Sequence, residues 1–320
     1  MTIVGIGGDM SGREAAVAAV AGINLRIAAA LAAVHVFAYA LVPLVLMPID
    51  PAWAAGAFAV TLATPSLWAL VHEGIHRHLH PVPQANDRIA RGLAILFGSP
   101  FRLVRFGHLT HHRLNGHAVE RPDHRPGRLF YYVYLTCGLY LAELAGCLAG
   151  FLPRTFQARL ARAAFYDGHP EALDTADAAV RALTSDRARQ ELRRDGALAL
   201  LVIAAAAVAY GDAWGWLAAA LVGRALVVSV LDNAFHYEGP LGDPHTGHNL
   251  AAPGWLGLVW LNFNLHRVHH RHPGIPWRDL PRAMAADGDR CDVPLARAVL
   301  RQFRGPVATG DPVRAAPERA

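Results

Sequence analysis

The chain alternates between long apolar stretches and segments rich in arginine and histidine. Residues 27–47 and 53–71 are almost entirely apolar. At about 1.5 Å per helical residue, either stretch can cross a hydrocarbon core of about 30 Å as a helix. The Pro-Ile-Asp-Pro link at 48–51 is typical of a tight turn. The pattern therefore predicts a hairpin of two membrane helices in the first quarter of the chain.

Three further apolar segments follow, at residues 129–152, 197–210 and 214–231. The last two are joined by Gly-Asp-Ala at 211–213, which predicts a second hairpin. Between the apolar stretches, residues 72–128 and 154–194 are rich in arginine, and the positive-inside rule places both on the cytoplasmic side. The first contains a short apolar stretch, 89–104, expected to lie along the interface and to position His108. The second predicts one or two amphipathic helices.

Composition supports a membrane protein. The 320 residues are 53% hydrophobic and 17% charged, and the mean hydropathy is +0.23, which is typical of a polytopic membrane protein. All basic residues are arginine, a bias typical of a GC-rich bacterial genome. We interpret the net charge of +5 as a signal for membrane orientation and not for nucleic-acid binding. The simplest organisation is one domain over residues 1–304 and a disordered tail over 305–320.

Histidines supply the candidate chemistry. Three clusters have helical spacing: His72-x-x-x-His76, His108-x-x-His111-His112 and His266-x-x-His269-His270. Residues three or four apart on a helix differ by about 40–60° in azimuth, so each cluster directs its imidazoles from one face. Without a metal, burying so many imidazoles beside hydrocarbon would cost about 1–3 kcal/mol for each unpaired nitrogen. The clusters therefore predict a metal site, although imidazole suits iron, zinc and copper alike.

The position of these clusters constrains the topology. The clusters at 72–112 and 266–270 reach one site only if an even number of crossings separates them, yet three apolar segments lie between. Residues 129–152 contain three glycines and Glu143, so we expect this segment to be re-entrant or to lie along the interface. The prediction is an all-α polytopic membrane protein with about four transmembrane helices under a cytoplasmic, histidine-rich cap.

With these three clusters the chain resembles the membrane fatty acid desaturase family. Members carry the same three histidine boxes in the same order on a four-helix membrane frame, and the resemblance covers about residues 27–282. Dependence on dioxygen, which the resemblance implies, favours iron among the metals that imidazole binds. The resemblance also implies that two iron ions are held by the box histidines His72, His76, His108, His111, His112, His266, His269 and His270.

Members of the family often place one more ligand histidine at the end of the helix before the third box. His236 is the best match here, and His245 and His248 are alternatives in the following loop. Animal desaturases place Asn four residues before that histidine. This chain departs from the pattern, because it has Asp232 there and Asn233 one position later.

Other polar residues are expected to orient ligands without binding metal. Glu73 could accept a hydrogen bond from an imidazole N–H and so orient that ring. It lies in the chain's single Glu-x-x-His motif, so the paired motifs of soluble carboxylate di-iron bundles are not present. Asp123 resembles an acidic position common in the family. The full set of candidates for such roles is Glu73, Asp123, Asp232, Asn233 and Asn264.

The resemblance implies an oxygen-dependent di-iron oxidoreductase of the bacterial inner membrane, with its site on the cytoplasmic side. Its substrate would be a fatty acyl chain of a lipid or thioester, held in an apolar tunnel. The sequence has no G-x-G-x-x-G motif and no set of four cysteines, so electrons are expected from a separate ferredoxin, rubredoxin or cytochrome with its reductase.

Three alternatives remain at this stage. Fatty acyl hydroxylation would use the same ligands as desaturation. A carotenoid ketolase or hydroxylase also fits, since that branch carries a box like 266–270 and a Pro-Trp-x-x-Leu-Pro stretch, here at 276–281. A membrane metal transporter is a distant alternative, because its ligands would lie at mid-bilayer depth and not at helix ends.

Overall fold

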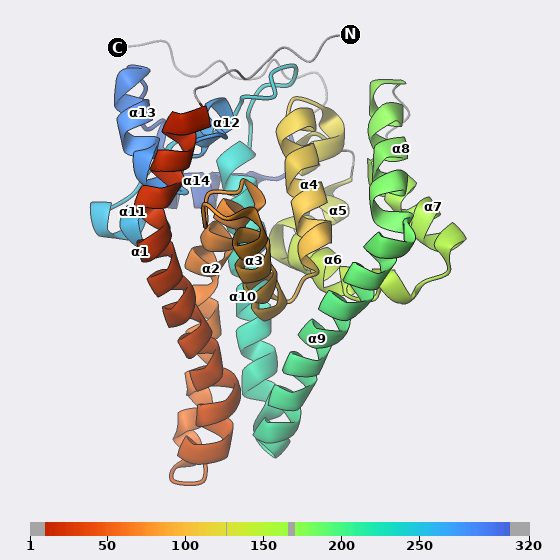
Figure 1. Ribbon diagram of the computed structural model, residues 1–320, viewed down its shortest axis with the longest axis vertical. Helices are drawn as coiled ribbons and strands as arrows, with labels where there is room; N and C mark the ends of the chain where they lie inside the picture. Colours follow the sequence, from red (N-terminus) through yellow and green to blue (C-terminus); the bar gives the residue numbers. More distant parts are fainter. Residues whose placement is uncertain (1–9, 126, 166–169, 308–320) are drawn as a thin grey trace.

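The structure is a computed structural model that describes residues 10–125, 127–165 and 170–307, and these residues are mostly helical (Figure 1). In this described part the only sheet is a parallel pair of two-residue strands, β1 (Leu250–Ala251) and β2 (Val293–Pro294). Leu250 lies opposite Val293. The predicted all-α class is confirmed.

The first helical hairpin forms at the predicted link. Helix α1 (Met10–Val36) continues into a π-helical stretch, Phe37–Leu46, and the chain returns through a 3-10 stretch, Pro51–Phe58, and α2 (Ala59–Ile75). Asp50 starts the return, because its carboxylate accepts the Ala52 N–H at 2.9 Å. The described helix begins well before the apolar run at 27, so sequence apolarity underestimates its length.

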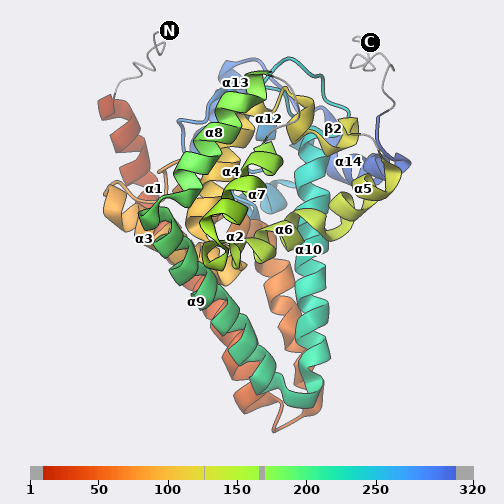
Figure 2. The same cartoon turned by 90° about the vertical axis from the view of Figure 1, so that its right-hand side faces the viewer.

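The second hairpin also matches the prediction. Helix α9 (Asp186–Tyr210) begins at Ser185, whose hydroxyl accepts the Ala188 N–H at 3.3 Å. A short turn at Gly211–Ala213 leads into α10 (Trp214–His236). The two hairpins converge at the end of the molecule opposite α12 and α13 (Figures 1 and 2). The Tyr210 hydroxyl donates to the Ala38 carbonyl at 2.8 Å and thereby joins them.

Within the described residues, four stretches are long and apolar enough to cross a membrane: Gly12–Leu46, Pro51–Ile75, Arg128–Gly146 and Asp186–His236. The last of these contains both α9 and α10. The protein is therefore a polytopic membrane protein, as the sequence predicts.

The segment 129–152 has a different place from the two hairpins. It comprises α5 (Arg128–Val133), a π-helical stretch, α6 (Leu139–Gly146) and a 3-10 turn, Ala149–Phe151. It lies beside the upper part of α10 and does not reach the tip where the hairpins converge (Figure 2). At its end, the Gly150 carbonyl accepts from Arg193 Nε at 2.7 Å. This arrangement favours the prediction that the segment is re-entrant, which stays a prediction.

Residues 89–104 are not the single interfacial stretch that the sequence predicts. They are divided between α3 (Pro83–Phe97) and α4 (Phe101–Leu114). Gly98 between them has φ +101°, a conformation that disfavours other residues, and Pro100 precedes α4. The result is a helical hairpin, and its second arm carries the second histidine box.

Buried polar contacts fasten this α3–α4 hairpin to the membrane helices. Arg224, on α10, is fully buried. Its guanidinium donates to the carbonyls of Leu96 and Phe97 at 2.9 and 3.1 Å, and so caps the last turn of α3. It also reaches His35 Nε2 at 2.8 Å, which joins α1 to the same point. Its Nε also donates to Thr64 Oγ1 on α2 at 3.2 Å, so four described helices meet at one buried charge.

The remaining helices surround the upper half of the molecule. The predicted amphipathic helices are α7 (Arg154–Phe165) and α8 (Pro170–Thr184). The others are α11 (Gly254–Val259), α12 (His266–Arg271), α13 (Leu280–Ala286) and α14 (Leu295–Arg301). Short 3-10 turns lie at Ala118–Glu120, Pro122–His124, Trp277–Asp279 and Gln302–Arg304.

The predicted disordered tail lies mainly outside the described residues. Its first three residues, 305–307, contact the rest of the protein. The Tyr237 hydroxyl donates to the Gly305 carbonyl at 2.8 Å, and the Val307 N–H donates to the Asp123 carbonyl at 2.7 Å.

Candidate metal centre

All nine histidines nominated from the sequence meet at one place, where they form two groups. We call them the five-histidine cluster, made of His72, His76, His108, His112 and His269, and the four-histidine cluster, made of His111, His236, His266 and His270. Within each cluster, one nitrogen from every residue lies within 4.8 Å of the others. Neither His245 nor His248 belongs to a cluster.

The helical spacing of the boxes explains this division. On α4, His108 and His112 are four residues apart and share a face, whereas His111 is turned by about 100° from His112. On α12, His266 and His270 form the equivalent pair and His269 turns away. Each His-His doublet therefore gives one imidazole to each cluster. Helix α2 completes the first cluster and α10 the second.

The spacing of the nitrogens fits a metal ion. In the five-histidine cluster, Nε2 of His269 is 2.9 Å from Nε2 of both His72 and His112. In the four-histidine cluster, Nε2 of His266 is 2.9 Å from that of His236 and 3.1 Å from that of His270. Two imidazole nitrogens bound at right angles to one ion at about 2.1 Å would be about 3.0 Å apart. The nitrogen–nitrogen distances in the clusters therefore already match those expected around one bound ion.

Burial keeps the imidazoles of His108, His112 and His269 neutral, which is the form that binds metal. Desolvation, followed by the neighbouring imidazoles, holds the pKa of His108 and His269 well below the usual value. Desolvation, followed by His111, lowers the pKa of His112 to about 3. At neutral pH these three members of the five-histidine cluster therefore offer lone pairs and carry no charge.

Glu73 lies beside the five-histidine cluster but makes its close contact elsewhere. Its Oε2 accepts the Trp277 N–H at 3.1 Å. Its Oε1 is 3.9 Å from His72 Nδ1, beyond hydrogen-bond distance. In this structure Glu73 therefore fastens the 276–281 stretch to α2 and lies near an imidazole without bonding to it.

Asp123 acts on the site through an arginine. Its carboxylate receives two hydrogen bonds from Arg121, at 3.3 and 3.2 Å, and both side chains are buried. Arg121 in turn donates to the carbonyls of His236 and Gly239. The pair thus fixes the end of α10, where His236 stands.

The other three nominated polar residues have different surroundings. Asp232 lines the cavity described below, as does Tyr134. Asn233 donates to Gln302 Oε1 at 2.7 Å, so its amide faces the C-terminal segment. Asn264 donates to the Leu250 carbonyl at 2.9 Å, and its buried Oδ1 has no partner among the described residues.

One carboxylate near the clusters is not among the nominated residues. Oε2 of Glu120 is 3.5 Å from Nδ1 of His111, closer than any nominated carboxylate comes to a box imidazole nitrogen. Glu120 lies on a 3-10 turn after α4. Sequence offers no spacing rule for such a turn, and only its place shortly after the second box could have suggested it.

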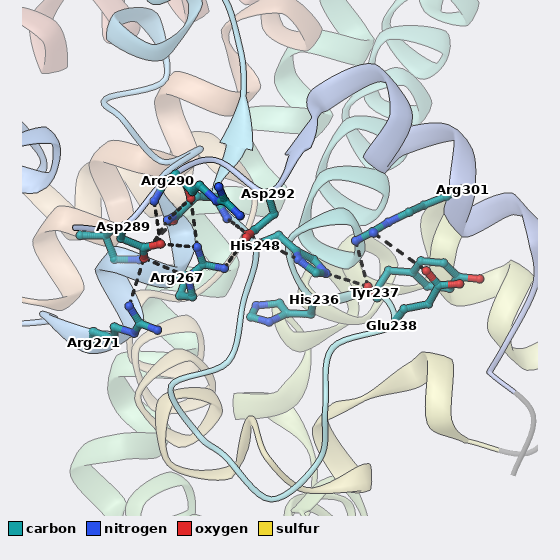
Figure 3. A network of polar contacts seen from close by, with 12 residues as sticks. His236, Tyr237, Glu238, His248, Arg267, Arg271, Asp289, Arg290, Asp292 and Arg301 are labelled. Atoms are coloured by element: carbon teal, nitrogen blue, oxygen red, sulfur yellow. Dashed lines mark hydrogen bonds and ion pairs between the residues drawn. The ribbon is translucent and has the colours of Figure 1, made fainter. Parts of the chain in front are cut away.

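The loop histidines are engaged by other groups. His248 Nε2 is 2.9 Å from the Tyr237 carbonyl, and its Nδ1 is 3.7 Å from Asp292 (Figure 3). His245 Nδ1 is 3.1 Å from the His270 carbonyl. Both residues therefore support the backbone around the ligands.

A charged network holds the third box against the C-terminal segment (Figure 3). Arg267, between His266 and Val268, donates to Asp289 at 3.0 Å and to Asp292 at 2.6 Å. Burial alone would raise the pKa of Asp289, yet hydrogen bonds from Arg267 hold it below the usual value. The network thus fixes α12 to the segment between α13 and β2.

A cavity of about 590 Å³ reaches both clusters. His108 from the five-histidine cluster and His111 and His236 from the four-histidine cluster form one wall. Most other lining residues are apolar and extend as far as Leu160 and Leu183. The geometry can place a long apolar chain beside both predicted metal positions.

Comparison with known proteins agrees with this geometry. The family model described as fatty acid desaturase matches residues 51–297, which include all three boxes. No curated protein and no solved structure matches the chain.

Proposed function

The chain belongs to the fatty acid desaturase family, and from this premise we propose that it is an oxygen-dependent di-iron enzyme that desaturates a fatty acyl chain of a lipid or thioester. Family membership makes it a membrane oxidoreductase of lipid substrates. The observation that carries the finer proposal is the pair of histidine clusters at the wall of one apolar cavity.

We assign one iron ion to each cluster. His72, His76, His108, His112 and His269 would hold the first ion, and His111, His236, His266 and His270 would hold the second. Bound iron would supply the reductive activation of dioxygen that removal of hydrogen from an unactivated methylene requires. The all-imidazole donor set is compatible with iron, and the family favours it over zinc.

The protein's own residues position the substrate and the ligands. The apolar cavity wall would exclude water and hold successive methylenes in one register beside His108 and His111. Glu120 is placed to accept the Nδ1 proton of His111 and so to direct Nε2 inward. Arg121 fixes the carbonyl of His236. These contacts support two neighbouring ligands of the four-histidine cluster.

The sequence supports a proposal for the cellular setting. The arginine-rich segments around the boxes support a cytoplasmic site in a bacterial inner membrane, with two hairpins spanning the bilayer. Electrons would come from a separate ferredoxin, rubredoxin or cytochrome with its reductase. The arginine-rich surface could dock an acidic carrier.

Lipid analysis of a bacterial host that expresses the gene tests the proposal. We expect new unsaturated acyl chains with the native sequence and none with His269→Ala at matched expression. New hydroxylated chains or a pigment change would instead support the hydroxylase or carotenoid alternative. Unchanged lipids and pigments, despite iron-loaded protein supplied with reductant and dioxygen, would contradict the assigned activity.

A further inference from the structure

Three acidic side chains lie among the mostly apolar residues that line the cavity. Glu120, Glu143 and Asp232 all line it. Glu120 Oε2 is 3.5 Å from His111 Nδ1. The Oε2 atom of Glu143 is buried and has no hydrogen-bond partner among the described residues. One acceptor in the cavity wall is therefore left for a ligand.

An unpaired buried carboxyl oxygen is costly to retain. Water could pair with it while the cavity is open, but an acyl chain that filled the cavity would displace that water. A plain hydrocarbon chain would then leave Glu143 unsatisfied. A chain with its own hydrogen-bond donor at this depth would not.

The unpaired oxygen belongs to the same cavity that the cluster histidines line. Glu143 and Asp232 line it together with His108, His111 and His236. A group bonded to Glu143 would therefore share this cavity with imidazoles of both clusters.

We propose that the cavity accepts a chain lipid that carries a hydroxyl group, whose O–H donates to Glu143 while another part of the chain faces the clusters. This inference rests on the proposed function and specifies its substrate class. A neutral hydroxyl suits the site better than an ammonium group, because the surrounding wall is mostly apolar and would oppose a buried charge.

Binding of matched probes to the purified iron-loaded protein tests this. Methyl stearate and a series of methyl hydroxystearates, with the hydroxyl at different positions, can be titrated by tryptophan fluorescence, since Trp68 and Trp260 line the cavity. We expect one positional isomer to bind about tenfold or more tightly than methyl stearate. Glu143→Leu should abolish that preference without weakening methyl stearate, and Glu143→Gln should keep part of it. Glu14→Gln, at an exposed position on α1, serves as the control.

Equal binding of all isomers and of methyl stearate would overturn the inference, as would a preference that survives Glu143→Leu. If the Glu143→Leu variant cannot be produced, binding of the same probes to the native protein and to Glu143→Gln tests the inference instead. Protein that desaturates unsubstituted chains with no hydroxyl preference contradicts only this inference. Protein that binds none of the probes and yields no lipid product contradicts the proposed function as well.

Discussion

The five-histidine and four-histidine clusters share α4 and α12 but differ in their third helix and in their surroundings. Helix α2 gives two imidazoles to the first cluster, whereas α10 gives only His236 to the second. Nδ1 of both His236 and His266 is buried without a partner among the described residues, while His111 has Glu120 beside it. With one nitrogen fewer, the four-histidine cluster leaves more of its ion's coordination to other ligands.

The comparison suggests a division of roles. With five imidazoles, the five-histidine cluster would be the more complete holder of a metal ion. The four-histidine cluster contributes two of the three imidazoles in the cavity wall and is the more open to a ligand from the cavity. We therefore expect its ion to be held less tightly.

The largest effect is expected from His269→Ala. This imidazole contacts two other members of the five-histidine cluster, so its loss should deplete the better-held ion. Product formation should fall by at least about 100-fold, more than the loss of an outer-shell partner causes. Iron content and lipid product are measured together, with thermal unfolding as a control for folding. Full activity in this variant would contradict the role of the five-histidine cluster.

His236→Ala should remove the single contribution of α10. We expect it to abolish product as well, but to lower iron by only about one ion per chain, with the five-histidine cluster still loaded, so its effect on metal content is the smaller of the two. His245→Ala and His248→Ala are matched controls in the adjacent loop and should each retain substantial activity. If His236→Ala keeps its iron and its activity while a loop variant loses both, the ninth ligand is assigned wrongly.

A smaller effect is expected from Glu120→Gln. Loss of the carboxylate beside His111 should reduce activity by about 10-fold and weaken only the four-histidine ion, as outer-shell changes do. Iron retention during timed exposure to a chelator measures this directly. Glu238→Gln, a partly exposed carboxylate outside the clusters, is the control. Equal iron loss from both clusters would show that Glu120 does not distinguish them.

The smallest effect concerns metal-free protein in acid. The pKa of His112 is lowered to about 3, whereas an unfolded histidine keeps its ordinary value near 6.5. Between these values only the unfolded state binds the proton, so stability falls as pH decreases. At pH 5 this residue alone should cost about 2 kcal/mol relative to pH 7. Thermal unfolding should show a shallower pH dependence for His112→Gln, and an identical slope would contradict this origin.

Local spacing made part of this site predictable from the sequence. The nine histidines of the two clusters follow from helical periodicity and the family resemblance, because each box lies within one or two helical turns. The roles of Glu120 and Arg121 depend on 3-10 turns and on contacts more than 100 residues apart along the chain, such as that from Arg121 to His236. Such long-range contacts cannot be predicted from the periodicity of the sequence.

The fold shows the same limit. Both hairpins follow from apolar length and turn residues, whereas the division of 89–104 into two helices depends on Gly98 and on a buried partner. That partner is Arg224 on α10, which caps α3 from a distant part of the chain. A moderately apolar stretch of this length looks the same in sequence whether it lies along an interface or folds back on itself.

Metal analysis of the purified native protein tests the central claim most directly. Elemental analysis, combined with Mössbauer spectroscopy of protein enriched in iron-57, counts the ions and distinguishes their surroundings. Two clusters with different numbers of nitrogen donors predict about two irons per chain in two non-identical sites. Active protein that contains stoichiometric zinc and no iron, or a single iron site, would contradict the account.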